Sequence, residues 1–464
     1  MIELRVLEDA VGVMLKEHQI EPFLGELFFW QDIASQLTKY ANLGFEQESQ
    51  QDVAWTMTAL RLIQIACATT SDCQALALAS RIHEPVIKIV AKHLTADHDK
   101  LAWRSMAVLS NMVTRNAAVA EVLYPIVLKA LPLQQTLQNG NTLEPSLVFL
   151  RNSVYADKTF LNLLSKDGPL LVSLLSTSEE GGLLGQQGAG QLVSAIIEEL
   201  MQNDCLESVI HSLYQEVDST RVEIRYLWEL IRDLCSQETL PQRLDVKVPL
   251  TIVAMLYQSL AELGNLQENN PTQNDLILWQ ILACQAAALS SILSNEQQQN
   301  LLKDQAIQAS VTPVVELLGI AHLRFPRTTG GRMKNVDETV VVRNLKRDCI
   351  AIIMNLSYGN KEIQDLVRTT GGLALVLAQC NIDESNPYIK EWATVCMRVL
   401  LEGNLENQAQ VENMTPIGTQ QTPELDELGL QSYLTPDGKV ELRQLANDQG
   451  VQATITSIND SYED

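Results

Sequence analysis

Residues 349–364, CIAIIMNLSYGNKEIQ, are repeated by residues 392–408, WATVCMRVLLEGNLENQ, at an offset of 44 residues. Three residues recur at that offset: Gly359, Asn360 and Gln364 return as Gly403, Asn404 and Gln408. In both segments apolar residues at helical spacing lead up to the Gly-Asn pair. Glycine and asparagine tolerate the left-handed backbone that closes a helix. The pair therefore predicts that one helix ends there and another begins.

The same internal spacing occurs upstream. In SMAVLSNMVTRN, Asn111 precedes Asn116 by five residues, and in FLRNSVYAD, Asn152 precedes Asp157 by five. Weaker copies, which rest on periodicity alone, start at Trp55, Gly190, Ile224 and Ala283. A period in the forties made of helix, break and helix is typical of armadillo and HEAT arrays, whose repeats bury their apolar faces only by stacking.

The composition agrees with a helical solenoid. Hydrophobic residues make up 46% of the 464 residues and aromatic residues only 5%, whereas a sheet would call for more Val, Thr and aromatic residues. We predict an all-α, armadillo/HEAT-like helical-repeat solenoid with a polar acidic C-terminal tail. Its expected parts are repeats over 1–340, a C-terminal repeat domain over 341–414, and an acidic, partly disordered tail over 415–464.

The charge balance disfavours two classes of partner. The chain has 33 Lys and Arg against 57 Asp and Glu, a formal net charge of −24, and such a surface repels phosphate backbones and anionic lipids. The N-terminus lacks the basic and apolar regions of a secretory signal. The apolar segment LILWQILACQAAALSSIL is interrupted by Gln280 and Gln285. We expect a soluble, cytoplasmic protein with no bound nucleic acid and no membrane insertion.

Neither a metal site nor a catalytic motif is predicted. The eight cysteines stand singly, mostly within apolar helical stretches, where a thiol behaves as a small hydrophobe. The sequence contains no zinc-type spacing, no Walker sequence, no H-E-x-x-H and no G-x-S-x-G. We therefore predict a protein that is not an enzyme and has no cofactor.

A cluster of basic residues stands out in this acidic chain. The segment that starts at His322 contains four residues that we predict as a docking loop for an acidic partner or for the acidic tail: Arg324, Arg327, Arg332 and Lys334. The alternative is a solvated loop that leads into the next helix, because runs of charge are usually solvated.

The tail carries three Thr-Pro dipeptides, the minimal context for a proline-directed kinase, at Thr415, Thr422 and Thr435. The alternative is that proline only breaks helices there. Four leucines in ELDELGLQSYL, at positions 425, 428, 430 and 434, predict one short amphipathic helix that folds back onto the array.

The C-terminal repeats also resemble a known family. The run from Lys346 to Gln408 closely resembles the conserved C-terminal domain of the ataxin-10 family, with matching positions that include Lys346, Arg347, Asp348, Gly371, Gly372, Cys380, Asn386, Pro387, Glu391, Trp392 and Asn404. One departure is Val399, which stands where the family has asparagine. The chain upstream resembles the family only in its armadillo character.

The resemblance implies a function. It implies a noncatalytic, cytoplasmic scaffold or adaptor linked to regulation of cytokinesis, which binds cell-division or signalling proteins and self-associates in animal members. The alternative is an intracellular copper-handling protein, because some fungal relatives carry a copper-transport name. Soft Cu(I) requires clustered Cys or Met, and the sequence supplies neither C-x-x-C nor a Met-rich run.

The predicted interaction residues lie in this C-terminal region: Asn355, Gln364, Asp365, Arg368, Asp383, Glu384, Lys390 and Glu391. Asp383, Glu384 and Lys390 are expected on an exposed surface, whereas Trp392 is expected in the core. Asn111, Asn152 and Asn355 hold one matching position, from which an asparagine can bind the backbone of an extended peptide. The alternative, which we favour for most of them, is that they cap or bridge neighbouring repeats.

Overall fold

The computed structural model describes residues 2–17, 22–94, 100–176, 188–218, 222–237, 244–266, 273–327, 344–383, 386, 388–414, 419, 423–436 and 439–444. The chain divides into two compact units. Unit 1 comprises residues 1–251 and 273–281, and unit 2 comprises residues 252–272 and 282–464. The predicted domain ranges 1–340, 341–414 and 415–464 stay predictions.

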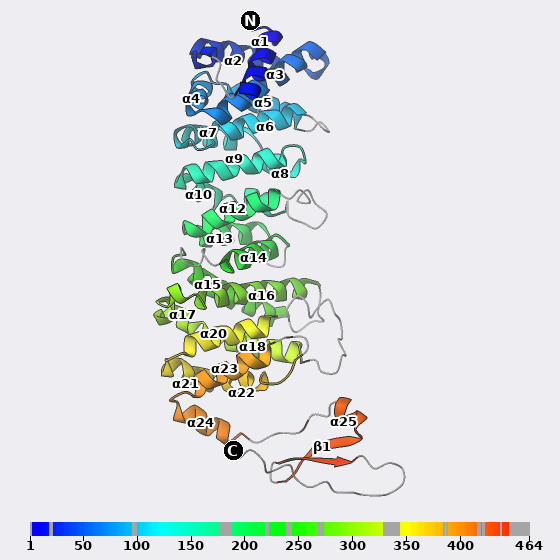
Figure 1. Cartoon of the computed structure of the whole chain (residues 1–464), viewed down its shortest axis with the longest axis vertical. Helices are drawn as coiled ribbons and strands as arrows, with labels where there is room; N and C mark the ends of the chain where they lie inside the picture. The colour runs from blue at the N-terminus through cyan, green and yellow to red at the C-terminus, as the bar shows by residue number, and fades with distance from the viewer. Residues whose placement is uncertain are drawn as a thin grey trace. The chain divides into compact units, whose positions relative to one another are not determined.

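Unit 1 is built from helices (Figure 1). Its α-helices are α1 Leu4–Glu17, α2 Leu27–Ala41, α3 Gln50–Thr69, α4 Ser71–Ala79, α5 His83–His93, α6 Lys100–Met112, α7 Ala117–Ala130, α8 Leu133–Gln138, α9 Leu143–Ala156, α10 Lys158–Leu164, α11 Gly168–Ser176, α12 Ala189–Gln202, α13 Leu206–Glu216 and α14 Val222–Cys235. Two short 3-10 helices lie between the first three α-helices: η1 Pro22–Gly25 between α1 and α2, and η2 Phe45–Gln47 between α2 and α3.

The helices α15 Lys247–Leu266 and α16 Gln273–Leu293 contribute residues to both units. Unit 2 then contains η5 Glu296–Gln298, η6 Leu301–Lys303, α17 Gln305–Ala309, α18 Val311–Arg324, α20 Leu345–Ser357, α21 Lys361–Thr369, α22 Gly372–Ala378, α23 Ile389–Leu401, α24 Leu405–Glu412 and α25 Pro423–Glu427. Two strands follow, β1 Leu430–Leu434 and β2 Val440–Gln444.

The helices form three-helix repeats in which the third helix of each repeat packs on the third helix of the next. In unit 1, α3 packs on α6, α6 on α9, α9 on α12 and α12 on α14, as their order in Figure 1 shows. In unit 2, α20 packs on α23, and the first helices α21 and α24 also contact each other. The predicted fold class, a helical-repeat solenoid of armadillo type, is confirmed.

Each new repeat starts at a side-chain cap. Thr70, Asn116, Asp157, Asn360 and Asn404 are the N-caps of α4, α7, α10, α21 and α24, and each side chain accepts a hydrogen bond from a backbone N–H of the first turn. Just before the last two caps, Gly359 and Gly403 have φ of +64° and +67°, the left-handed region that favours glycine. The Gly-Asn pair therefore ends one helix and caps the next, as predicted.

The core lies between the stacked helices. Tyr124 of α7 lies against two buried aromatic rings, with ring centroids 6.1 Å from Phe149 and 4.5 Å from Phe160. Elsewhere Leu, Ile, Val and Ala fill the contacts, and full burial of one large aliphatic side chain contributes about 1.5–3 kcal/mol. Because each helix buries its apolar side on the neighbouring repeat, stability depends on the stack.

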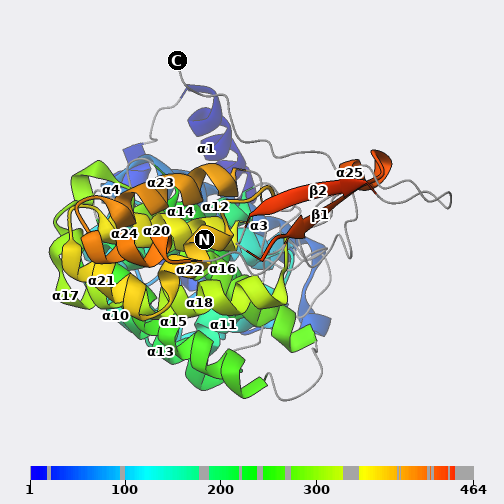
Figure 2. The ribbon, with the colours of Figure 1, turned by 90° about the horizontal axis from the view of Figure 1, so that it is seen from below.

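The chain after α24 differs from the predicted amphipathic helix. Among the described residues after α24, only those of the short α25 are helical. Gly429 follows α25 with φ of +66°, and β1 pairs with β2 in an antiparallel hairpin, which Figure 2 shows. The prediction of one helix through Leu434 is wrong because Gly429, in the left-handed region, ends the helical segment, and residues 430–434 pair with residues 440–444 as a strand. Within the described residues, β1 and β2 are the only strands.

Two segments are long and apolar enough to span a membrane by length and composition alone, Leu276–Leu293 and Gln305–Arg324. In the first, 67% of the residues are buried inside the structure, and in the second 50%. Buried Gln285 in the first donates a hydrogen bond to Ser259 Oγ at 3.1 Å. Core helices of soluble proteins have the same composition, so this is weak support for a membrane span.

Candidate protein-interaction surfaces

The matching asparagines of the third helices bridge to the preceding repeat. Asn111 Nδ2 donates to Gln64 O of α3 at 2.9 Å, and Asn152 Nδ2 donates to Thr114 Oγ1 at 2.9 Å. Asn355 Nδ2 donates to Ser294 Oγ, just after α16, at 3.0 Å. The side-chain amide of each asparagine thus donates a hydrogen bond to another residue of the array. This placement agrees with the structural alternative, in which these residues tie neighbouring repeats together.

A second bridge between repeats recurs in both units. In unit 1, Gln74 Nε2 donates to Cys67 O at 2.9 Å and to Asn111 O at 2.8 Å, while Asn116 Nδ2 donates to Gln74 Oε1 at 2.8 Å. Gln74 lies four residues after the cap Thr70, and Asn116 is the cap of the next repeat. One glutamine therefore joins the third helix of the preceding repeat, the third helix of its own repeat and the cap of the next repeat.

Gln364 occupies the same place in unit 2. Its Nε2 donates to Ser357 O at 3.2 Å and to Val399 O at 3.0 Å, and its Oε1 accepts from Asn404 Nδ2 at 3.2 Å. Only 4% of Gln364 is exposed, so the expectation that this side chain meets a partner is not supported by its position. The recurrence of Gln364 as Gln408 was the signal in the sequence for this bridge.

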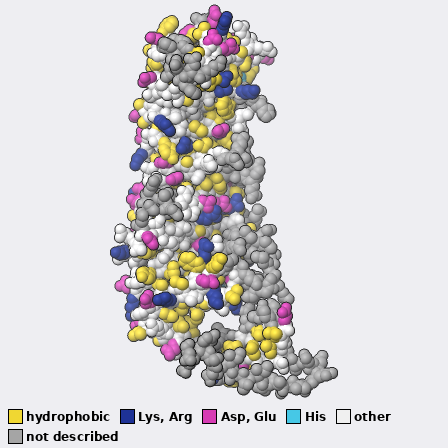
Figure 3. All heavy atoms as spheres, viewed as in Figure 1, with side chains coloured by type: hydrophobic (Ala, Val, Ile, Leu, Met, Phe, Trp, Pro, Cys, Tyr) yellow, Lys and Arg dark blue, Asp and Glu magenta, His cyan; other side chains and the backbone are white. Residues whose placement is uncertain are grey.

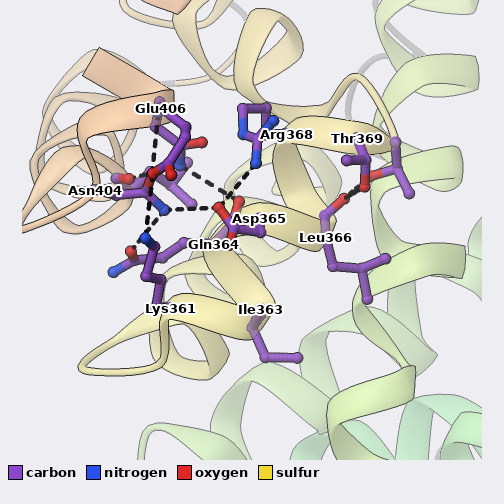
Figure 4. A network of polar contacts seen from close by, with 12 residues as sticks. Lys361, Ile363, Gln364, Asp365, Leu366, Arg368, Thr369, Asn404 and Glu406 are labelled. Atoms are coloured by element: carbon purple, nitrogen blue, oxygen red, sulfur yellow. Dashed lines mark hydrogen bonds and ion pairs between the residues drawn. The ribbon is translucent and has the colours of Figure 1, made fainter. Parts of the chain in front are cut away.

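Asp365 and Arg368 form a polar network at the edge of the same repeat (Figure 4). Asp365 Oδ1 accepts from Asn404 Nδ2 at 3.0 Å and from Arg368 at 3.0 Å. These hydrogen bonds, that of Asn404 first, lower the pKa of the Asp365 carboxyl below its ordinary value. Lys361 Nζ and Glu406 Oε2 lie 3.2 Å apart beside them. Both Asp365 and Arg368 stay partly exposed, so this edge is accessible to a partner.

Asp383 is buried, which corrects the expectation of an exposed carboxylate. Only 6% of it is exposed, Asn386 Nδ2 donates to Asp383 Oδ2 at 2.9 Å, and Lys346 Nζ lies 3.8 Å from the same oxygen. Lys346 is also buried and donates to Phe325 O. Burial lowers the pKa of Lys346, and Asp383 opposes that shift. A buried ammonium requires a counter-charge, so Asp383 stabilises the fold.

The N-terminal half of α23 presents the exposed residues of this region. Lys390 and Glu391 are exposed, as expected, whereas Glu384 lies outside the described residues. Trp392 is 37% exposed and Val395 is 51% exposed. The expectation that Trp392 belongs to the core is therefore wrong. Tyr388, the N-cap of α23, is exposed and has a left-handed backbone with φ of +68°.

The predicted basic loop and kinase sites fall largely outside the described residues. Arg332, Lys334, Thr415 and Thr422 are among the undescribed residues. Arg324 is exposed, with its guanidinium 5.2 Å from the centre of the Phe325 ring, and Arg327 is partly exposed. Thr435 lies in the turn of the hairpin, where its Oγ1 donates to Lys439 O at 2.9 Å and accepts from Lys439 N at 3.0 Å.

Unit 1 contains a hollow that the sequence analysis missed. It has a volume of about 690 Å³ and is lined by the C-terminal ends of α3 and α9, by residues just after α6 and by the start of α4. The charged side chains that line it are both arginines, Arg115 and Arg151. The Arg151 guanidinium lies 5.0 Å from the centre of the Tyr155 ring. No motif marks these residues, because they come together only when three repeats stack.

Two carboxyl groups, those of Glu199 and Glu198, interact with Tyr155 of the lining of the hollow. The Glu199 carboxyl interacts with Tyr155 and accepts from Asn203 Nδ2 at 3.3 Å. Burial and the adjacent Glu198 raise the pKa of Glu199 above its ordinary value, and burial, followed by Glu199, raises the pKa of Tyr155. Elsewhere on the face shown in Figure 3, acidic and basic side chains are interspersed. Both charged residues that line the hollow are thus basic, although the chain as a whole is acidic.

The described residues offer little to a metal ion. Among them, no group of three or more His, Cys, Asp or Glu side chains is placed to hold one. Seven cysteines are buried and Cys380 is partly buried. Burial raises the pKa of Cys235 to about 12 and also raises the pKa of Cys67, which disfavours the thiolate form that binds metals.

Comparison with known proteins identifies the C-terminal region. Residues 345–443 match the spinocerebellar ataxia type 10 protein domain. The ataxin-10 homolog of Schizosaccharomyces pombe is 34% identical over 141 residues, which are 29% of this chain and 32% of that protein. The ataxin-10 homolog of Dictyostelium discoideum is 36% identical over 118 residues, 25% of this chain and 19% of that protein. Ataxin-10 of Xenopus tropicalis is 37% identical over 109 residues, 24% of this chain and 22% of that protein.

Among solved structures, a designed armadillo repeat protein is 12% identical, with a TM-score of 0.21, and the match covers 80% of this chain and 99% of that one. A chain from structural work on a phosphorylation switch in the cadherin–β-catenin interaction is 13% identical, with a TM-score of 0.36, and covers 89% of this chain and 70% of that one. The fold assignment rests on the helix packing described above. The sequence matches span about a third or less of the first three relatives' lengths. The predicted resemblance of the C-terminal region to the ataxin-10 family is confirmed over residues 345–443.

Proposed function

We propose that this protein is a noncatalytic, cytoplasmic scaffold that binds other proteins and takes part in the regulation of cytokinesis. The protein-binding part of the proposal is supported by the stacked third helices, which present a continuous surface across several repeats. The link to cell division is supported by the similarity to ataxin-10 relatives, which the C-terminal domain carries. Self-association, which the resemblance implies, belongs to the same proposal.

The arginine-lined hollow is the observation that supports a specific binding site for a partner. It spans the ends of three consecutive third helices, so an extended segment of a partner can contact several repeats at once. Arg115 is exposed and has a left-handed backbone with φ of +54°. Arg151 is held against the Tyr155 ring, and such cation–π contacts contribute about 0.5–1 kcal/mol at exposed sites.

The chemistry of the hollow selects an acidic peptide segment. Guanidinium groups bind carboxylates in a bidentate manner, and both charged residues of the lining are arginines. The amide of Asn152 already donates to Thr114 Oγ1, so recognition rests on Arg115, Arg151 and the Tyr155 ring rather than on an asparagine ladder.

Partner capture from dividing cells tests the proposal. Tagged full-length protein is compared with R115Q/R151Q and with K88Q/K129Q, a control that removes two exposed positive charges outside the hollow. We expect cytokinetic partners to be recovered with the wild-type protein and the control and to be lost with R115Q/R151Q. Equal recovery with all three proteins would contradict the hollow as the site. Recovery of no cell-division protein with the wild type would contradict the cytokinesis proposal.

Copper handling remains the alternative function, and one measurement separates it from the scaffold. Elemental analysis of the purified full-length protein gives the copper content per chain. The buried thiols and the lack of a metal-holding group among the described residues lead us to expect less than stoichiometric copper. Stoichiometric copper that survives dialysis would favour the alternative.

A further inference from the structure

The last third helix of unit 2, α23, exposes residues whose equivalents in the preceding third helix, α20, are buried. The third helix α20 buries Asp348 and Ala351, which are 4% and 3% exposed, and α20 packs on the following third helix, α23. At the offset of 44 residues the equivalent positions of α23 are Trp392 and Val395, which are 37% and 51% exposed. Within the described part of the chain, no third helix follows α23 in the stack.

In α24, the first helix after α23, Gln408 also lacks one of the contacts that its equivalent in α21 makes. Gln408 Nε2 donates to Leu401 O at 2.8 Å, as Gln364 donates to Ser357 O one repeat earlier. Gln364 is buried and also accepts from the cap Asn404 of the next repeat. Gln408 is exposed, and the described residues supply no such cap. We define Trp392, Val395, Gln408 and Ala409 as the open face.

A repeat array cannot leave such a face uncovered without cost, because terminal repeats need a polar outer surface or a cap. The exposed side chains of Trp392 and Val395 form an apolar surface instead of a polar one. The open face therefore requires an occupant.

The hairpin of β1 and β2 has two chemically different sides. One side carries polar contacts across the strands: Tyr433 Oη donates to Glu441 Oε2 at 2.7 Å, and Arg443 Nε donates to Gln431 Oε1 at 2.9 Å. The alternation of a strand places Leu434, Val440 and Leu442 on the other side. Val440 is 60% exposed.

A two-stranded hairpin by itself is marginally stable in water and needs an apolar surface to pack against. The hairpin contacts the short α25 through β1, but Val440 of β2 stays exposed, so the hairpin and the open face both present apolar surface to solvent. Both lie in unit 2, and the matched family domain spans residues 345–443, so it includes both of them. Fifteen residues lie between Met414 and Leu430, and a chain of that length reaches at most roughly 50–60 Å when extended.

We propose that the hairpin is the cap of the repeat array: its Leu434, Val440 and Leu442 side docks on the open face of the same chain. The covalent connection favours this occupant over a second copy, because a short linker holds the hairpin at a local concentration in the millimolar range. Docking covers the Trp392 and Val395 side chains and gives the hairpin the apolar surface that it requires.

Hydrogen–deuterium exchange on the full-length protein tests the cap. The variant L434K/L442K places charges on the apolar side of the hairpin, and L428K is the control, because Leu428 is 69% exposed and precedes the strands. We expect exchange in α23 and α24 to rise at least about tenfold with L434K/L442K and to stay at the wild-type rate with L428K. If the hairpin exchanges faster while α23 and α24 keep the wild-type rate, the proposal is overturned.

Cross-linking identifies the occupant directly. The variant V395C/V440C is treated with a short bis-maleimide at low protein concentration, with the single variants V395C and V440C as controls. A cross-link between positions 395 and 440 within a monomer supports the proposal. A cross-link found only in covalent dimers would assign the open face to a second copy and overturn it, and so would the lack of any cross-link between these positions.

Discussion

Gln364 Oε1 accepts a hydrogen bond from Asn404 Nδ2 at 3.2 Å, and Gln74 Oε1 accepts one from Asn116 Nδ2 at 2.8 Å. In both pairs the glutamine lies four residues after the cap of its own repeat and the asparagine is the cap of the next. The same bridge therefore holds successive repeats together in both units.

Removing this bridge should destabilise the fold. In Gln364→Ala, two backbone carbonyl groups and Asn404 lose a buried partner, and an unsatisfied buried polar group costs about 1–3 kcal/mol. We expect a loss of that size in the free energy of unfolding, measured by urea denaturation. Gln408→Ala is the matched control, because Gln408 is exposed, and its change should stay within about 0.5 kcal/mol. Equal effects of both substitutions would contradict the bridge.

The glycine before each cap should be intolerant of alanine. Gly403 has φ of +67°, and a left-handed backbone costs a residue with a Cβ atom roughly 1–2 kcal/mol. Gly403→Ala should lower the free energy of unfolding by about that amount. Gly12 lies inside α1 with open space around its Cα, so Gly12→Ala should raise it by about 0.5–1 kcal/mol. Thermal denaturation of both variants gives the comparison, and a stabilised Gly403→Ala variant would refute the left-handed turn.

The buried pair of Lys346 and Asp383 should be sensitive to loss of one partner. Asp383→Ala leaves the Lys346 ammonium buried without its carboxylate, and breaking such a pair costs about 3–5 kcal/mol. We expect Lys346→Met/Asp383→Leu to recover part of that loss, because it removes both charges. Urea denaturation of the three proteins measures this. If the double variant is no more stable than Asp383→Ala, the charge is not the cause.

Buried thiols should make stability fall at alkaline pH. Burial raises the pKa of Cys349 above its ordinary value of 9.0, so the folded chain keeps a proton that the unfolded chain releases. The stabilisation from this thiol is fully present below pH 9.0 and is lost as the pH rises towards the folded pKa, by up to about 1.4 kcal/mol per pH unit. Cys349→Ala should show a shallower fall than the wild type between pH 8 and 10.5 in denaturant titrations under reducing conditions. If the free energy of unfolding of the two proteins fell in parallel with rising pH, the proposed contribution of the Cys349 thiol would be contradicted.

Thr435 should control the turn of the hairpin. Its hydroxyl both donates to and accepts from the backbone of Lys439, and each net hydrogen bond contributes about 0.5–1.5 kcal/mol. Phosphorylation of Thr435 removes the hydroxyl proton that Lys439 O accepts and adds negative charge. We expect both Thr435→Val and the phosphorylated protein to exchange amide hydrogens faster over residues 430–444. Unchanged exchange in both would show that the turn does not depend on this hydroxyl.

Local signals in the sequence predicted the repeats well. The Gly-Asn pairs, the caps and the helix periods depend on a few neighbouring residues, and helices α3, α6, α9, α12, α20 and α23 contain the copies expected from Trp55 onward. The hairpin was harder to predict, because LQSYL does not strictly alternate apolar and polar residues, and its leucines were assigned to a helical face.

The candidate sites were harder to predict, because burial depends on residues distant in the sequence. Asp383 was expected at the surface, but Lys346, 37 residues earlier, supplies a buried counter-charge. Trp392 was expected in the core, yet the described chain places no further repeat over it. The hollow of Arg115 and Arg151 forms from three repeats and has no counterpart in any local motif.

The glutamine bridge also gives the array a direction. Gln74 precedes Asn116 in the chain, and Gln364 precedes Asn404, so in each pair the acceptor leaves the ribosome before its donor. A repeat that has already formed can hold the starting point of the next helix as soon as that helix is synthesised. Assembly from the N-terminus then adds each repeat to an ordered template, and the exposed apolar surface at any moment is limited to the growing end.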